Sequence, residues 1–92
     1  MRDFIVHDQR DNVGVAVVDI KTGQTVKGEF LSGGAVAPIT ASQPIPLGHK
    51  IALRDFSAGD TVIKYGEDIG KVVAEIRTGE HVHVHNLKTK RW

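Results

Sequence analysis

Three histidines alternate with two valines near the end of the chain, in the order His81-Val82-His83-Val84-His85. In an extended strand, residues two apart share one face and lie about 7 Å apart at Cα. Two neighbouring imidazoles can therefore lean onto one metal ion, at metal–nitrogen distances of about 2 Å. The outer pair, His81 and His85, would lie roughly 13 Å apart. The pattern predicts a divalent metal, iron or another, on His81 and His83. It leaves His85 to carry a proton, bind substrate or orient a ligand.

The alternative is that this row is simply the solvent-facing side of an edge strand, where Thr or Lys would serve as well. We favour a functional interpretation because clustered histidines tend to mark sites. Asn86 extends the run and offers an amide for hydrogen bonding, so we assign it to substrate binding.

A second candidate is His49-Lys50, which follows Gly48 at the start of an expected strand. An ammonium at that position can reach an anionic substrate. We therefore expect His49, Lys50 and His85 to be catalytic and Lys50 also to bind substrate. Alone, the His49-Lys50 pair is weak evidence of a functional site, since a surface lysine beside a histidine is commonplace. We interpret Tyr65 as a half-buried side chain with Lys64 outside, rather than as a catalytic group.

The elements that must position these residues are short strands. Ten glycines and three prolines interrupt the chain every few residues, which leaves few intervals long enough for a helix. Apolar residues alternate with period two instead, as strands require. The clearest alternating segments are 13–18, 25–30, 51–53, 61–65 and 81–86. The sequence predicts an all-β protein, a small barrel or clip-like fold.

Three eight-residue segments, 19–26, 55–62 and 75–82, share one pattern: acid, apolar, two variable residues, Gly, polar, variable, Val. This pattern suits a turn whose glycine takes positive φ between two strands. The spacing between copies is unequal, which favours one compact domain over a solenoid. Segment 31–46 differs, because it holds Gly33-Gly34 and three prolines. We expect an irregular loop there, in which 35–39 could pair briefly as an edge strand.

Length and charge limit the function. Ninety-two residues allow a single domain, 1–92, without a large cleft, so any chemistry is expected at an interface with a larger partner. Twelve basic against eleven acidic residues argue against nucleic acid as a partner. The chain has no cysteine, no apolar segment long enough for a membrane span and no signal peptide, so we expect a cytoplasmic protein.

Four motifs occur in order at 48–53, 62–66, 69–70 and 79–86, reading GHKIAL, VIKYG, IG and GEHVHVHN. This series resembles the N-terminal domain of the altronate and galactarate dehydratase family, over about Phe4 to Asn86. The resemblance implies the SAF type of β-clip fold. It also implies a role for His49 and the histidine strand, without saying which histidine does what.

The chain ends soon after the histidine strand and so looks like a separately encoded small subunit, similar to that of sulfolactate sulfo-lyase. The resemblance implies a large lyase subunit as partner and a metal-assisted elimination of water or sulfite from a hydroxy acid. A homo-oligomer is also possible. The alternatives are a free-standing carbohydrate-binding or assembly module of the same fold type, and simple metal sequestration by the histidine row.

Overall fold

The computed structural model describes residues 2–83 and 85–88, and these residues form nine strands and no helix. The strands are β1 (Phe4–Val6), β2 (Val13–Ala16), β3 (Thr25–Phe30), β4 (Ala35–Thr40), β5 (Lys50–Ala52), β6 (Thr61–Lys64), β7 (Glu67–Val72), β8 (His81–Val82) and β9 (Leu87–Lys88). The predicted all-β class is confirmed.

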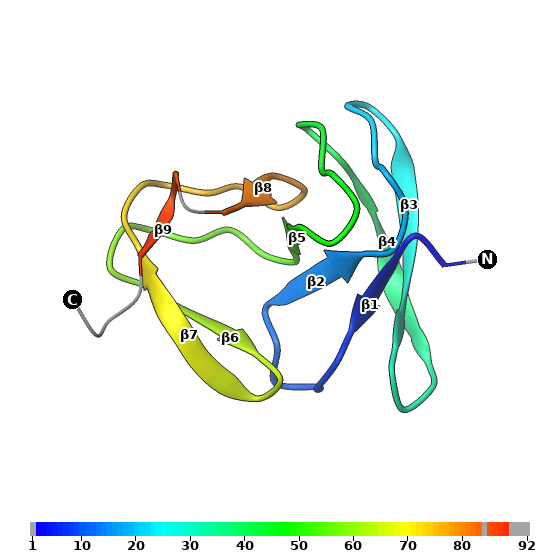
Figure 1. Ribbon diagram of the computed structural model, residues 1–92, viewed down its shortest axis with the longest axis horizontal. Helices are drawn as coiled ribbons and strands as arrows, with labels where there is room; N and C mark the ends of the chain where they lie inside the picture. The colour runs from blue at the N-terminus through cyan, green and yellow to red at the C-terminus, as the bar shows by residue number, and fades with distance from the viewer. Residues whose placement is uncertain (1, 84, 89–92) are drawn as a thin grey trace.

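The strands form two sheets, which face each other across the molecule in Figure 1. The larger sheet has the order β4-β3-β1-β2-β5-β8, and the smaller has the order β6-β7-β9. Most neighbours are antiparallel, but β1 and β3 run parallel. The parallel pair arises because β2 runs antiparallel to β1 on one side of it, and the chain then returns as β3 on the other side.

Two hydrophobic clusters fill the interior, and β5 belongs to both. Ile51 faces the first cluster, which includes Phe4 and Ile45. Ala52, the next residue, faces the second cluster, which includes Phe56 and Val82. Alternation along a strand explains this division, because successive side chains point to opposite faces. Strand β5 is thus fixed on both sides, and the residues at its start, His49 and Lys50, are held with it.

The repeated eight-residue pattern forms paired corners. Ile20 bridges Ile45, and Phe56 bridges Ile76, in each case through two backbone hydrogen bonds of 2.7–3.0 Å. Three of these four corners were predicted from the repeat. The fourth, around Ile45, was missed because prolines stand on both sides of it where the other copies carry an acid and a variable residue.

The corner that leads into β8 is the most tightly packed of the four. Gly79 has a φ of 88° and donates its N–H to the carbonyl of Ala52 at 2.9 Å. A Cβ added at Gly79 would collide with the carbonyl oxygen of Thr40, whereas one added at Gly59, at a φ of 97°, would meet nothing within 4 Å.

This difference makes Gly79→Ala and Gly59→Ala a matched pair. Both should lose about 1–2 kcal/mol of unfolding free energy, because an L side chain disfavours positive φ. Gly79→Ala should lose about 1–3 kcal/mol more, since backbone must shift to admit the methyl group. Chemical denaturation of the two variants measures the difference. Equal losses of unfolding free energy would mean that the backbone around Thr40 can move away from the added methyl group without a further loss of stability.

One expectation is confirmed in part and one is wrong. Within 31–46, the edge strand expected at 35–39 is present as β4, which pairs with β3 at the sheet edge and has a register shift between Val26 and Gly28. The histidine segment, expected to be extended over 81–86, is a strand only at His81–Val82. Val84, the second valine of this segment, lies outside the described residues. No helix among the described residues is long and apolar enough to cross a membrane.

Candidate functional site

Pairing between β5 and β8 creates the histidine site. The two strands are antiparallel, with Lys50 opposite Val82 and Ile51 opposite His81. This register brings His49 beside His81 in β8 and beside His83, just after that strand. The Nδ1 atom of His49 lies 2.8 Å from Nε2 of His81, and the rings of His49 and His83 stack at 4.3 Å. One ring nitrogen from each of the three lies within 4.8 Å of the others, and all three side chains are partly buried.

The predicted pair, His81 and His83, does lie together, with ring centroids 5.4 Å apart. The third nitrogen comes from His49, which we had assigned to catalysis and not to the metal. His85 lies outside this set. The 13 Å expected between the Cα atoms of His81 and His85 assumed an extended strand, but the strand ends at Val82, and the two ring centroids lie 5.4 Å apart. The cause is a turn after β8, in which the N–H of Leu87 donates to the carbonyl of His83 at 2.9 Å.

Asn86 holds this turn. Its side chain is buried, and its Oδ1 accepts the N–H of His83 at 2.9 Å. Its Nδ2 donates to the carbonyl of His81 at 2.8 Å and faces Nε2 of His85 at 3.0 Å. The two backbone bonds fix which end of the amide is Nδ2, so Nε2 of His85 is the acceptor. The proton of neutral His85 therefore sits on Nδ1. In this arrangement Asn86 orients His81, His83 and His85, and its contact with substrate stays a prediction.

A residue that the sequence did not single out also positions the site. Gln43 accepts the backbone N–H of His81 through Oε1 at 2.9 Å. It comes from the segment that we expected to be an irregular loop, and nothing in its immediate sequence indicates a role. This contact ties the corner before β5 to the start of β8.

The electrostatics of the site favour neutral imidazoles. Burial lowers the pKa of His81 to about 4, and the nearby charges of His49, His83, His85 and Lys50 act in the same direction. Burial and the neighbouring His49 and Lys50 also lower the pKa of His83. A neutral imidazole keeps a lone pair for a metal ion. These histidines are therefore in the protonation state that ligation needs near neutral pH.

The arrangement fits a transition-metal ion. Two nitrogens bound at 2.0–2.1 Å in tetrahedral geometry are about 3.3 Å apart. The His49 and His81 nitrogens are closer than this, at a hydrogen-bonding distance of 2.8 Å, and the three nitrogens all lie within 4.8 Å of one another. Side-chain rotation that opens the His49–His81 contact would be needed to bring all three to one centre. Imidazole donors suit zinc, iron, nickel and copper more than magnesium or calcium. Three protein ligands would leave positions open for substrate or water.

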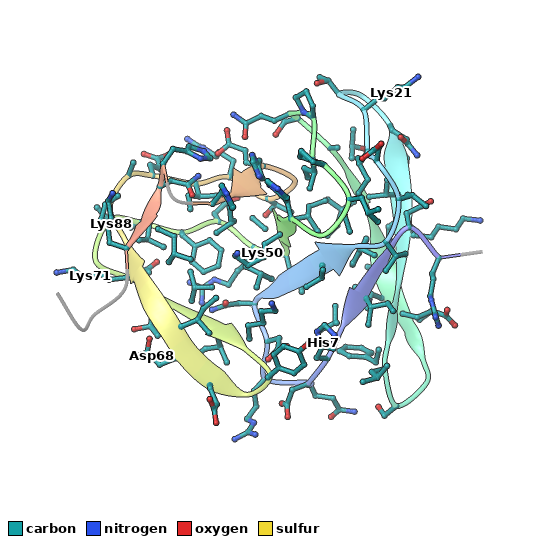
Figure 2. All side chains as sticks on the ribbon, viewed as in Figure 1. His7, Lys21, Lys50, Asp68, Lys71 and Lys88 are labelled. Carbon is teal, nitrogen blue, oxygen red and sulfur yellow. The ribbon has the colours of Figure 1, made fainter. Side chains whose placement is uncertain are left out.

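Lys50 lies next to this cluster, in the middle of the molecule between the two sheets (Figure 2). It is half-buried, and burial lowers the pKa of its ammonium; the positive charge of Lys64 lowers it further. No carboxylate of the described residues forms an ion pair with Lys50. A partly desolvated cation without a partner is a favourable contact for an anion.

Comparison with known proteins agrees with this fold. The chain matches the altronate/galactarate dehydratase SAF domain over residues 2–90. It is 52% identical over 91 residues to (2R)-sulfolactate sulfo-lyase subunit alpha of Chromohalobacter salexigens, which covers 98% of this chain and 97% of that subunit. The subunit of the same name from Paracoccus pantotrophus is 63% identical over 54 residues, or 59% of this chain and 81% of that one.

The altronate dehydratase of Bacillus subtilis is 43% identical over 89 residues. These residues make up 97% of this chain and only 17% of that enzyme, so this chain corresponds to a small part of a much longer protein. The resemblance inferred from the four ordered motifs is confirmed. The chain belongs to the altronate/galactarate dehydratase family, as a SAF domain.

Proposed function

We propose that this chain is the small subunit of a lyase that removes sulfite from a sulfolactate-type hydroxy acid, and that it completes the active site of a larger subunit. The observation that carries the proposal is the match to a sulfo-lyase subunit alpha along 97% of that subunit's length. The relation to altronate dehydratase covers one short part of a longer chain and is weaker in identity. Sulfite is therefore favoured over water as the leaving group.

We propose His49, His81 and His83 as the ligands of a divalent transition metal, on the support of their convergent nitrogens. A metal held there would supply Lewis-acid polarisation of a substrate oxygen. Among the described residues this cluster alone brings three metal-ligating groups together, which distinguishes it from a scattered histidine surface.

The other roles fall to groups around the cluster. Lys50 binds the substrate carboxylate, because it is a partly buried cation with no carboxylate partner among the described residues. His85 is exposed, and the Asn86 amide occupies its Nε2 and leaves its proton on Nδ1, so it suits donating a proton during the elimination. The reaction removes a proton from the carbon beside the carboxylate while the carbon–sulfur bond breaks. The electron pair of that bond leaves with sulfite.

The test is reconstitution. The chain should be inactive alone and should support sulfite release from (2R)-sulfolactate when mixed with a large sulfo-lyase subunit. Altronate serves as the second substrate: dehydration of altronate without sulfite release from sulfolactate would change the leaving group to water. A chain that binds carbohydrate and activates no lyase subunit would favour the binding-module alternative. The expected cytoplasmic location stays a prediction.

A further inference from the structure

The turn between β6 and β7 consists of only two residues, Tyr65 and Gly66. Both have positive φ, 56° and 72°, as in a type I′ hairpin turn. Such turns favour Asn-Gly or Gly-Gly, because a bulky L residue is strained in this conformation. Among the described residues, Tyr65 is the only non-glycine residue with positive φ. Turn geometry alone would therefore favour asparagine here, and the tyrosine needs another explanation.

The Tyr65 side chain adds little burial to offset this strain. It is 58% exposed, so the half-buried tyrosine expected from the sequence is wrong. Its ring stacks on the ring of His7, with the centroids 4.0 Å apart and an interplanar angle of 28°. The Nδ1 atom of His7 is buried without a hydrogen-bond partner in the described part of the chain, so this region carries a desolvation cost as well. Fold stability therefore does not explain why an aromatic ring stands at this turn.

The loop between β1 and β2 nevertheless holds the turn firmly. The buried carboxylate of Asp11 accepts the N–H of Tyr65 at 2.9 Å and the N–H of Gly66 at 2.7 Å. The guanidinium of Arg10 lies against Gly66, where an added Cβ would collide with it. Figure 2 shows His7, from the same loop, toward the tip of the β6–β7 hairpin. The exposed ring is therefore fixed in place in the free chain.

Charged groups of both signs surround this ring. The Nζ atom of Lys64 lies 5.1 Å from the ring centre, a cation–π contact. Glu67, the register partner of Lys64 across the hairpin, is exposed. Asp8 and Arg10 form an ion pair at 3.0 Å beside Gly66. An exposed, rigid aromatic side chain within a polar rim is typical of the residues that dominate binding at protein–protein interfaces, among which tyrosine is enriched.

The other large exposed hydrophobic side chains differ from Tyr65 in their backbone. Leu31, Leu47 and Val73 are 61%, 59% and 44% exposed, and none of them has positive φ. Single exposed apolar side chains on an unstrained backbone are normal on a protein surface. Tyr65 combines exposure, backbone strain and fixation by a neighbouring loop. This combination indicates a ring that is held ready for contact with another molecule.

We propose that the Tyr65 ring is an anchor through which this chain docks onto the large lyase subunit, in an apolar pocket of that subunit. The inference rests on the proposed function, which supplies the partner. It gives Tyr65 no part in the chemistry of the histidine site. The loop that carries His7 and Asp11 holds the ring in position before the subunits meet, so little conformational freedom is lost on docking.

The variant Tyr65→Asn separates docking from folding, because it gives the turn the Asn-Gly pair that type I′ turns favour. It should bind the large subunit at least about 30-fold more weakly than the wild type, as expected for loss of an anchoring aromatic side chain. Its thermal unfolding midpoint should be unchanged or higher, since backbone strain is removed. Titration calorimetry with the large subunit measures the affinity, and scanning calorimetry of the free chain measures the midpoint.

Leu31→Asn is the matched control, since Leu31 is equally exposed and lies in the separate β3–β4 turn of the larger sheet (Figure 1). It should bind the large subunit as the wild type does. Equal weakening in the two variants would mean that affinity follows exposed apolar area in general, and would overturn the role of Tyr65. Unchanged affinity of Tyr65→Asn would overturn it as well.

Turnover at a saturating concentration of this chain distinguishes docking from chemistry. Tyr65→Asn should then reach the wild-type kcat for sulfite release, because only assembly is weakened. Unchanged affinity with a lower kcat would place the ring at the substrate and contradict docking. A wild-type complex that forms but releases no sulfite would instead overturn the proposed function, and the affinities would still test the anchor.

Discussion

Replacing His83 with alanine should lower kcat/KM of the two-subunit enzyme at least about 100-fold and abolish stoichiometric binding of a divalent metal. His83 stacks on His49 and supplies one of the three convergent nitrogens. Two remaining ligands hold a metal much less tightly than three, and a loss of 100-fold corresponds to about 2.7 kcal/mol of transition-state stabilisation. Titration calorimetry with Zn²⁺ and Fe²⁺ measures the binding, and sulfite release measures the turnover.

The fold should survive this change. The contacts that hold the turn after β8 use the backbone of His83: its N–H donates to Asn86, and its carbonyl accepts from Leu87. An alanine keeps both groups. Unchanged metal stoichiometry together with unchanged turnover would remove His83 from the site.

His85→Ala is the control that separates ligation from proton transfer. The His85 ring is exposed and lies outside the three-nitrogen cluster. This variant should bind metal as the wild type does and still lose turnover. Loss of metal binding in His85→Ala would mean that the ligand set includes the turn after β8, and the assignment of His49 would then need revision.

Local patterns in the sequence were sufficient to predict the strands and most of the corners. Alternation over 25–30 predicted β3 with its observed bounds. The glycine repeat predicted three of the four corners that pair through the two isolated bridges. Pro38 made 31–46 look irregular, because proline removes a backbone donor. It is tolerated in β4 because that strand lies at the sheet edge and pairs only with β3.

The sequence was sufficient to predict the histidines of the site, but not that His49 lies together with His81 and His83. His81 and His83 are two residues apart, so a local argument finds them. His49 joins them across 32 residues of sequence, through the pairing of β5 with β8. Register between distant strands depends on both clusters of the core, which no single segment encodes. The turn at 85–86 also escaped prediction, because the bonds that make it come from Asn86, which we had assigned to substrate.

Phe4→Ala should cost about 4–5 kcal/mol of unfolding free energy, the upper part of the range for buried aromatic residues. The Phe4 ring is fully buried and lies against two strands at positions where each carries a glycine, Gly14 in β2 and Gly28 in β3. A Cβ added at Gly14 would lie 2.6 Å from the ring, and one added at Gly28 would overlap it. Without the ring, part of the cavity wall would be the bare backbone at Gly14 and Gly28, which has no side chain to move in.

Phe30→Ala is the control within the same cluster, since Phe30 is only partly buried at the end of β3. It should cost about 1–3 kcal/mol, because fewer contacts are lost. Urea denaturation of both variants measures the difference, and a smaller loss in Phe4→Ala than in Phe30→Ala would mean that the strands close over the cavity. For a domain whose total stability is about 5–15 kcal/mol, the expected loss leaves little margin. Strand β1 pairs with β2, and β2 pairs with β5, which positions His49. The histidine site should therefore be lost when this sheet unfolds.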